Sequence, residues 1–367
     1  MEPHARAQSP DRIGDDVLDD LRRRLVATNR VRLPEGTGWS RGTDASYLTD
    51  LIGYWSGDYD WRQHEERILS LPWETITVGD TSVRALHQRS PGAADTVMLV
   101  HGWPDSVLRF ERVLPLLTDV NVVVPCLPGF PFAPPLTRTG MSPSAVGDLY
   151  VELMAALGYR RYVASGGDIG SSVVQCMAIS APDAVSALHL TDVPTSHLMS
   201  LDPADLDADE TAFLAAVLQW RQSEGAYAHE QSTKPHTLAV ALGDSPAGLL
   251  AWIVEKLRSW SDCGGDVETV FGREDLLTWV TAYWVTGVIG TSFTPYVEPR
   301  GPVEPVGVPA VVTAFSGDLV SAPRSYGERL FDIREWIEHD SGGHFAAWEK
   351  PELFVAGVRS AIGAQAR

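Results

Sequence analysis

The sequence is poor in cysteine and contains no long apolar run. Only 3 of the 367 residues are cysteine (Cys126, Cys176 and Cys263), and no two form a CxxC pair. This argues against a disulfide framework or a zinc site and favours free thiols in a reducing compartment. No stretch of about 18 apolar residues occurs, and the N-terminus, MEPHARAQSPDRIGDD, lacks the apolar segment of a signal peptide. We therefore expect a cytoplasmic protein that does not span a membrane.

Basic residues are also scarce. The chain has 29 Lys and Arg against 48 Asp and Glu, which gives a net charge of −19 and a pI of about 4.8. Such a negative surface repels nucleic-acid phosphates and anionic lipids, so we expect neither a nucleic-acid partner nor a membrane surface. With 367 residues, 44% of them hydrophobic, the chain can bury the core of one large domain or two, as globular enzymes do.

Strand-like and helix-like patterns alternate along most of the chain. The runs TVMLV (96–100), NVVVP (121–125) and VPAVVTAF (308–315) are apolar throughout, as in strands covered on both faces. A helix is expected over about 106–117. This alternation predicts an α/β fold with a mostly parallel sheet and helices on both faces. A long helical stretch interrupts it and divides the chain into an N-terminal arm (1–74), a first core segment (75–195), a helical lid (196–303) and a second core segment (304–367).

One stretch, YVASGGDIGSSVVQC (162–176), has the pattern of a nucleophile elbow with aspartate in the usual place of serine. A short apolar strand leads into Gly-Gly-Asp-Ile-Gly, and a segment that can be helical follows. Such a turn strains its central residue and brings the flanking backbone close, which requires small residues such as Gly166 and Gly170. The N-terminus of the following helix favours an ionised carboxylate. We therefore predict that Asp168 is the nucleophile.

The partners of such a nucleophile follow it in a fixed order, because α/β-hydrolases place the acid next and the histidine last. His344 lies in SGGHFAAWEKPE, a loop just before the final helical pattern, and is favoured over His339 as the base. Asp318 comes directly after the apolar strand of 308–315 and is the predicted acid, whereas Glu328, Asp332 and Glu335 have the pattern of solvated charges. Backbone N–H groups of Trp103, in the HGWP turn, and of Ile169 are the predicted oxyanion donors.

An aspartate nucleophile indicates displacement at carbon. Its carboxylate is ionised at pH 7 and needs no base, so the histidine is free to activate water against an ester intermediate. An acyl-aspartate would be an anhydride, which disfavours peptidase and esterase chemistry. Epoxide opening then needs a proton donor, such as a lid tyrosine, whereas halide release commonly uses a tryptophan after the nucleophile, where this chain has Ile169. A haloalkane dehalogenase, an epoxide-opening cyclase and a non-enzymatic binding module with a degenerate site remain alternatives.

Several longer stretches resemble the epoxide hydrolases of the microsomal type, and the similarity covers most of the chain. They include LPWETITVGDTSVRALHQRS, HGWP, GYRRYVASGGDIG, STKPHTLAVALGDSPAGLLAWIVEKLRSW, YWVTGVIGTSFTPY and SGGHFAAWEKPEL. The resemblance implies an α/β-hydrolase fold with a helical lid and an N-terminal meander, and hydrolysis of a small-molecule epoxide to a vicinal diol without a metal or organic cofactor. It implies Asp168 as nucleophile, His344 as base, Asp318 as its partner, and Tyr227 and Tyr296 as the tyrosines that polarise the epoxide. Composition alone does not distinguish these two among the 10 tyrosines.

The chain departs from the family pattern at HGWPDS, at Ile169 and at PGFPFA, which place Asp105, Pro131 and Ala133 at positions we expect near the active-site entrance. We expect substrate contacts from Trp103, Pro104, Ile169 and Phe293. The aromatic lid (Trp252, Trp260, Trp279, Trp284 and Phe293) suggests a bulky apolar epoxide or a secondary metabolite, although most of these rings would be lid core. A homodimer would be compatible with the sequence.

Overall fold

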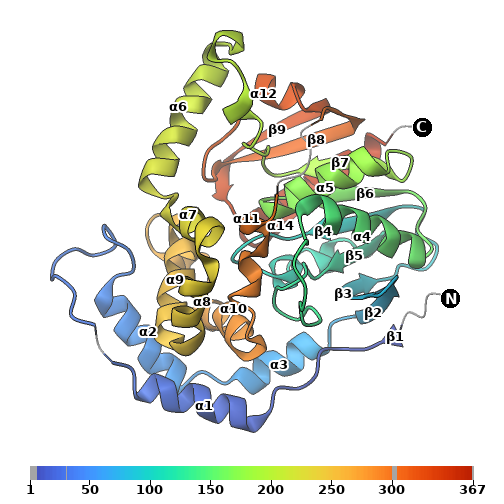
Figure 1. Cartoon of the computed structure of the whole chain (residues 1–367). Helices are drawn as coiled ribbons and strands as arrows, with labels where there is room; N and C mark the ends of the chain where they lie inside the picture. Colours follow the sequence, from blue (N-terminus) through green and yellow to red (C-terminus); the bar gives the residue numbers. More distant parts are fainter. Residues whose placement is uncertain (1–5, 30, 300–303, 366–367) are drawn as a thin grey trace.

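A nine-stranded sheet organises the computed structural model, which describes residues 6–29, 31–299 and 304–365 (Figure 1). The strand order is β1-β2-β3-β5-β4-β6-β7-β8-β9. The first three strands pair antiparallel, and the strands from β5 to β9 run parallel. The strands are β1 (Arg6–Ala7), β2 (Trp73–Val78), β3 (Thr81–Gln88), β4 (Thr96–Val100), β5 (Asn121–Pro125), β6 (Tyr162–Gly166), β7 (Val185–Leu190), β8 (Val306–Gly317) and β9 (Phe331–Gly343).

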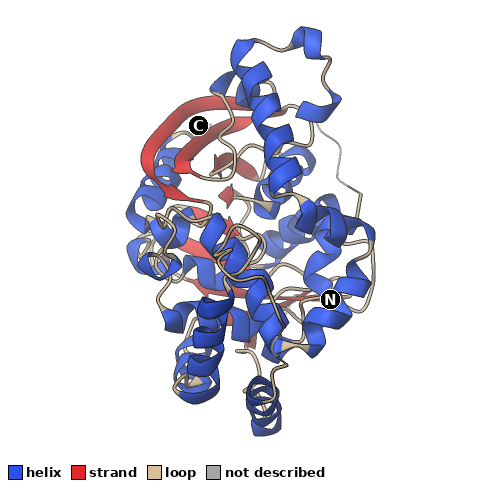
Figure 2. Cartoon of the chain, turned by 90° about the vertical axis from the view of Figure 1, so that its left-hand side faces the viewer, coloured by secondary structure: helices blue, strands red, loops and turns tan. Residues whose placement is uncertain are grey.

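The centre of the sheet is buried on both faces. All residues of β4, β6 and β7 are buried, as the continuous apolar runs predict. Helices α4 (Pro143–Ala156) and α5 (Ile169–Ser180) pack on each other, and α14 (Pro351–Gly363) packs on β7 and β8. Figure 2 shows helices on both sides of the curved strands. The predicted α/β class with a mostly parallel sheet is therefore confirmed.

A group of helices lies between β7 and β8 in the sequence and beside the strands in space, and we call it the lid (yellow to orange in Figure 1). These helices are α6 (Ala208–Ser223), α7 (Ala226–Thr233), α8 (Pro235–Asp244), α9 (Pro246–Ser259), α10 (Arg273–Thr286) and α11 (Thr294–Val297). The arm helices α1 (Asp15–Val26), α2 (Ala45–Gly57) and α3 (Trp61–Leu69) run along them. Thr43 donates a hydrogen bond to the carbonyl of Ala251 (2.8 Å), which fixes the arm to α9.

The helix expected over 106–117 is the clearest error of the sequence-based prediction. The structure has two short 3₁₀ turns there, η1 (Val107–Phe110) and η2 (Leu114–Leu116). Pro115 lacks a backbone N–H, and an α-helix continuing through it would lose a hydrogen bond. The remaining short helices of the core are α12 (Arg324–Glu328) and α13 (Ala346–Glu349).

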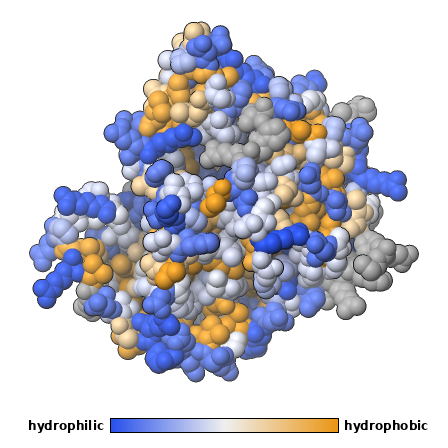
Figure 3. Space-filling view, viewed as in Figure 1, coloured by the Kyte–Doolittle hydropathy of each residue, from blue (hydrophilic) through white to orange (hydrophobic). Residues whose placement is uncertain are grey.

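The surface is hydrophilic over most of the face in Figure 3, where apolar side chains form small groups among polar ones. Within the described residues, no single helix is both long and apolar enough to cross a membrane. Two bent helix pairs, α8 with α9 and α10 with α11, pass that test by length and composition only.

Candidate active site

The predicted elbow is a sharp turn between β6 and α5. Asp168 has φ 56° and ψ −126°, a conformation that L-residues rarely adopt and that is typical of strained functional sites. A Cβ on Gly166 would lie 2.4 Å from the carbonyl oxygen of Gly170, and one on Gly170 would lie 2.3 Å from the carbonyl oxygen of Val100. Both contacts are with backbone that no side-chain rotation can relieve, so the turn requires glycine at both positions.

Both oxygens of the Asp168 carboxylate face groups of the core. Its Oδ1 accepts a hydrogen bond from the backbone N–H of Trp103 (2.9 Å), and its Oδ2 lies 3.4 Å from Nε2 of His344. A Cβ on Gly102 would lie 2.4 Å from Oδ1, so the glycine of the HGWP turn makes room for the carboxylate. Ile169 begins α5 directly after the aspartate. The side chain of Asp168 is 14% exposed and lines a cavity, where a ligand can reach it.

His344 stands between two carboxylates. Its Nδ1 lies 2.8 Å from Oδ1 of Asp318, which follows β8, and its Nε2 faces Asp168. Burial lowers the pKa of His344, but the attraction of Asp318 and Asp168 outweighs burial and raises that pKa to about 10. Burial raises the pKa of Asp318, yet the charge and hydrogen bond of His344 keep that pKa below its usual value. The raised pKa of His344 favours a protonated imidazole in the free site.

Tyr227 of α7 and Tyr296 of α11 come from the lid and line the same cavity as Asp168. Their rings meet edge to face with centroids 6.0 Å apart. The Trp103 ring stacks on Tyr227 (5.3 Å, 12°) and meets the edge of Tyr296 (6.1 Å, 87°), so the residue whose N–H binds Asp168 also orients both tyrosine rings. Burial, and then the charges of Tyr227 and Asp168, raise the pKa of Tyr296 well above its ordinary value, which keeps its hydroxyl protonated.

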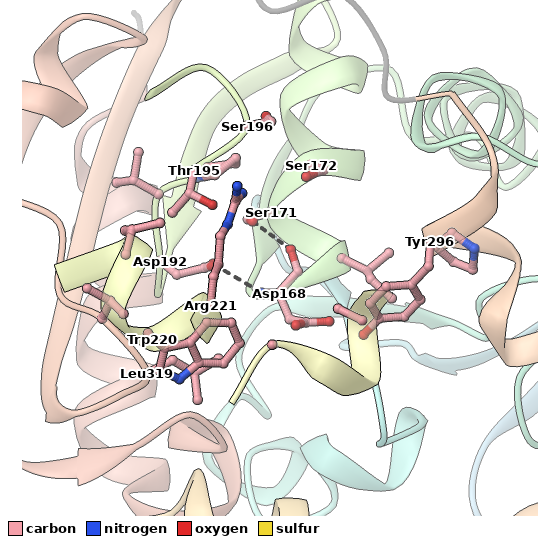
Figure 4. A pocket seen from close by; sticks show the side chains of 18 of the residues that line it. Asp168, Ser171, Ser172, Asp192, Thr195, Ser196, Trp220, Arg221, Tyr296 and Leu319 are labelled. Atoms are coloured by element: carbon pink, nitrogen blue, oxygen red, sulfur yellow. Dashed lines mark hydrogen bonds between the residues drawn. The ribbon is translucent and has the colours of Figure 1, made fainter. Parts of the chain in front are cut away.

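The cavity has a volume of about 750 Å³ and lies between the carboxyl ends of the strands and the lid. The structure brings Asp168, Ile169, Asp318, His344, Tyr227 and Tyr296 together in its wall. In Figure 4, Asp168 lies between Tyr296 on one side and Asp192 on the other. Glu328, Asp332 and Glu335 lie elsewhere, paired with Arg324, Arg334 and Ser360 respectively, as expected for surface charges.

The predicted substrate contacts fit the cavity only in part. Trp103 and Phe293 are fully buried, and neither they nor Pro104 belong to the cavity wall, whereas Ile169 does. The aromatic residues of the lid (Trp252, Trp260, Trp279, Trp284 and Phe293) are likewise absent from the wall. Trp260, Trp279 and Phe293 pack against rings of the core, and Trp284 lies against Arg24 of the arm. The number of aromatic residues in the lid therefore says nothing of the polarity of the substrate.

Asp105, which we expected near the entrance, is fully buried beneath the HGWP turn. It accepts a hydrogen bond from the N–H of Gly102 (2.9 Å), and its Oδ2 pairs with Arg109 (2.6 Å). Arg109 also donates to the carbonyl oxygen of His344. Pro131 is buried outside the cavity wall as well. The Asp105–Arg109 pair thus connects the HGWP turn with the loop of His344, a link between distant segments that no local pattern predicts.

Asp192 is a further residue that the sequence analysis missed. It follows β7 and lines the cavity, and its Oδ1 accepts a hydrogen bond from the backbone N–H of Asp168 (3.1 Å). Burial, and then the charges of Asp318 and Asp168, raise the pKa of Asp192 to about 7. Its position directly beyond an apolar strand was a usable signal, because ligands of parallel α/β sheets bind at the carboxyl ends of the strands.

The sheet order and the elbow define an α/β-hydrolase, and comparison with known proteins confirms this class. The family model described as "alpha/beta hydrolase fold" matches residues 95–351, and the model described as "Epoxide hydrolase N terminus" matches residues 9–110. The chain is 34% identical to a Stigmatella aurantiaca (strain DW4/3-1) protein that is itself assigned to the epoxide hydrolases, over 95% of this chain and 82% of that protein. It is 29% identical to epoxide hydrolase 1 of Sus scrofa, over 95% and 87%. The chain belongs to the epoxide hydrolase family.

Solved structures agree with this assignment. The structure of Aspergillus niger epoxide hydrolase superposes with a TM-score of 0.83 at 29% identity and covers 97% of both chains. The juvenile hormone epoxide hydrolase of Bombyx mori superposes with a TM-score of 0.87 at 25% identity, over 98% of this chain and 94% of that one. Among the residues that our structure describes, no group of three or more His, Cys, Asp or Glu side chains is arranged to hold a metal ion.

Proposed function

We propose that this epoxide hydrolase converts an epoxide and water to a vicinal diol through a covalent ester on Asp168. The observation that carries the proposal is the placement of one carboxylate between a backbone N–H and a histidine, in a cavity that two lid tyrosines also line. The carboxylate supplies the nucleophile and the phenols supply hydrogen-bond donors for the epoxide oxygen. The carboxylate forms the new bond, and the phenols speed the step by stabilising the negative charge that develops on the epoxide oxygen.

In the first step, an oxygen of Asp168 attacks a ring carbon and the C–O bond of the epoxide breaks. The hydroxyls of Tyr227 and Tyr296 stabilise the alkoxide that develops, and one of these phenols gives the alkoxide its proton and is left as a phenolate. Because the pKa of Tyr296 is raised, its phenol is protonated before the reaction and can act as a donor. The product of this step is a neutral alkyl ester of Asp168.

In the second step, His344 activates water. The ester no longer carries the negative charge of Asp168, which is one of the two charges that raise the pKa of His344 in the free site. The imidazole therefore gives up its proton more readily once the ester has formed, and that proton returns through solvent to the phenolate left by the first step. The neutral imidazole then takes a proton from water as the water oxygen attacks the carbonyl carbon of the ester, and Asp318 holds the imidazolium. The imidazolium returns a proton to the oxygen of the departing diol, which came from Asp168, and the new carboxylic acid of Asp168 gives its proton to the imidazole.

Ring opening is favoured over halide displacement by the composition of the cavity wall. Halide release commonly uses indole N–H donors, and Trp220 is the only tryptophan among the described residues of that wall. The residue after the nucleophile is Ile169, which offers a donor only through its backbone.

A single turnover in ¹⁸O-water, with enzyme in excess over a racemic aryl or alkyl epoxide, tests the covalent route. The first diol should contain no heavy oxygen, and the label should appear instead in the peptide that contains Asp168. Heavy oxygen in the first diol would mean that water attacks the ring directly, with Asp168 acting as a base.

A further inference from the structure

The wall of the cavity is polar on the side away from the tyrosines. Ser172 comes from α5, Thr195 and Ser196 from the loop after β7, and Arg221 from α6. Figure 4 shows the guanidinium end of Arg221 reaching toward Thr195 and Ser196, while Tyr296 lies on the other side of Asp168. The sequence suggested an apolar substrate and gave no indication of this polar wall.

Hydrogen-bonding groups of this wall lack protein partners. The hydroxyls of Ser172, Thr195 and Ser196 make no hydrogen bond to any other residue in the described part of the chain. Gln175 is the most telling member of the wall, because its residue is 6% exposed and its Nε2 is buried without a partner among the described residues. A buried amide left unpaired costs about 1–3 kcal/mol, so such a group is expected to meet a partner in the functional state.

Helix geometry gives the distance along α5 between the backbone of Gln175 and the backbone of Asp168. Ser172 and Gln175 are three residues apart on α5 and therefore share one face of the helix. Gln175 is seven residues beyond Asp168, and at 1.5 Å per residue its Cα lies about 10 Å along the helix from the nucleophile. A substrate that is attacked at Asp168 and also reaches Gln175 must therefore extend well beyond the epoxide ring.

The charges of the cavity favour a neutral group at that end. Asp168, Asp192 and Asp318 all line the cavity, and their carboxyl groups oppose the approach of an anion. Arg221 is exposed, so its charge is screened by solvent. The partnerless groups themselves are an amide and hydroxyls, which bind a carbonyl, ether or hydroxyl oxygen without a charge.

We propose that the side of the cavity formed by Ser172, Gln175, Thr195 and Ser196 binds a neutral oxygen-bearing substituent located about 10 Å from the epoxide ring of the substrate. The inference rests on the proposed function, because it assumes that the epoxide is attacked at Asp168. It narrows the substrate from any epoxide to an extended, oxygenated one, and it replaces the bulky apolar epoxide suggested by the lid aromatics.

Three matched epoxides test this proposal. They share one chain length and end in a methyl, a methyl ketone or a carboxylate about 10 Å from the ring. We expect kcat/KM to be about tenfold higher for the ketone than for the methyl compound, since a pocket built to hydrogen-bond a substrate group discriminates against the analogue that lacks it. In Gln175→Met this ratio should fall toward one. The exposed Gln219 of the lid offers a matched control, and Gln219→Met should keep the ratio of the parent enzyme.

Each result supports or overturns the proposal. Equal kcat/KM for the ketone and methyl compounds overturns it, a preference that survives in Gln175→Met overturns the placement, and a preference for the carboxylate overturns the neutral character. A second readout needs no turnover, namely the affinity of the three corresponding diols, measured by isothermal titration calorimetry. If no epoxide is hydrolysed while the ketone diol binds about tenfold more tightly than the methyl diol, the proposed function fails and the polar site stands. Equal affinities overturn the site. If Gln175→Met does not fold, Gln175→Asn, which withdraws the amide by one methylene, should reduce the same ratio.

Discussion

The core and the lid contribute to the same cavity by different physical means. On the core side, backbone geometry fixes the reacting groups, since Asp168 is held by the N–H of Trp103 and by glycine-lined turns. On the lid side, Tyr227 and Tyr296 stand on short helices and are oriented mainly by ring contacts with Trp103 and with each other. A hydrogen-bonded backbone tolerates little displacement, whereas ring packing allows repacking. Under the proposed mechanism, we expect the core to set which reaction occurs and the lid to set how well a given substrate is positioned for it.

The charges are divided in the same way. In the core, His344 lies between the carboxyl groups of Asp318 and Asp168, and these two neighbours raise the pKa of the histidine to about 10. The lid supplies a neutral phenol at Tyr296, because burial raises the pKa of that residue. This division predicts that removing a core group stops a chemical step outright, whereas removing a lid hydroxyl slows a step that still proceeds.

The largest expected effect is on the core. Asp168→Ala should lower kcat by about 10⁴-fold or more, because no other group can form the ester. His344→Ala should form the ester but not release it, so intact-protein mass spectrometry should show an increase equal to the mass of one epoxide. Asp168→Ala treated in the same way is the control and should gain no mass. If His344→Ala still carries out repeated turnovers, His344 is not the base that activates water in the second step.

The lid tyrosines should give the next largest effect. Tyr227→Phe and Tyr296→Phe should each reduce kcat by about 10–100-fold, and the double variant by about 10³-fold or more, because each phenol can partly replace the other. Stopped-flow measurement of ester formation locates the loss in the first step. Tyr326→Phe is the matched control, since that hydroxyl is buried against the carbonyl of Pro194 outside the cavity wall and should affect stability alone. A double variant as active as either single one would contradict a shared role.

Glycines extend the comparison from chemistry to folding. Gly170→Ala should destabilise the protein by about 3 kcal/mol or more, because the new Cβ would lie 2.3 Å from the carbonyl oxygen of Val100. Gly53 lies in the middle of arm helix α2 with open space around it, so Gly53→Ala should stabilise by about 0.5–1 kcal/mol. Urea unfolding followed by circular dichroism measures both. If Gly170→Ala unfolds at the same urea concentration as the parent, the elbow is less constrained than the structure indicates.

The same division explains what the sequence could reveal. The backbone demands of the core are written locally, as glycines on both sides of Asp168 and as a fixed chain order of Asp318 and His344. The structure brings these three side chains together. The tyrosines carry no such local mark, and only the resemblance to a family distinguishes Tyr227 and Tyr296 among the 10 in the chain. Their placement depends on how whole helices pack, which no short pattern encodes.

Other features depended on contacts between distant segments and were beyond sequence reasoning. The pairing of Arg109 with Asp105 and with the carbonyl of His344 joins loops 235 residues apart in the chain. The helix expected over 106–117 was wrong, and the structure has two 3₁₀ turns there, the second of which contains Pro115. The aromatic residues of the lid were identified but their surroundings were not, since periodicity does not distinguish a ring that lines a cavity from one that packs beneath it.

Substitution of Asp192 should have the smallest effect on stability and rate. It tests whether the charge of Asp192 influences the other charged groups of the core. Its pKa is raised to about 7 by burial and by the charges of Asp318 and Asp168. Because this folded-state pKa exceeds that of an aspartate in the unfolded chain, roughly 3.9, the folded protein keeps a proton that the unfolded chain releases between about pH 4 and 7. Its contribution to stability is therefore present at low pH and lost as the pH rises through this window. Asp192→Asn keeps the oxygen that accepts from the N–H of Asp168 and should remove this loss, so the variant gains stability relative to the parent at pH 8 rather than at pH 4.

The same titration should appear in the reaction. Above about pH 7, ionised Asp192 adds a negative charge near His344, so the imidazole holds its proton more tightly and less of it is in the neutral form that can activate water. Asp192→Asn should therefore raise kcat by about threefold at pH 8 and leave it unchanged at pH 5.5. Asp183 lies exposed at the other end of β7, and Asp183→Asn should leave both the stability and the rate profiles as they are. If the plot of kcat against pH for Asp192→Asn still shows an inflection near pH 7, another group of the core titrates there instead of Asp192. The charges of the core would then be those of Asp168, Asp318 and His344 alone.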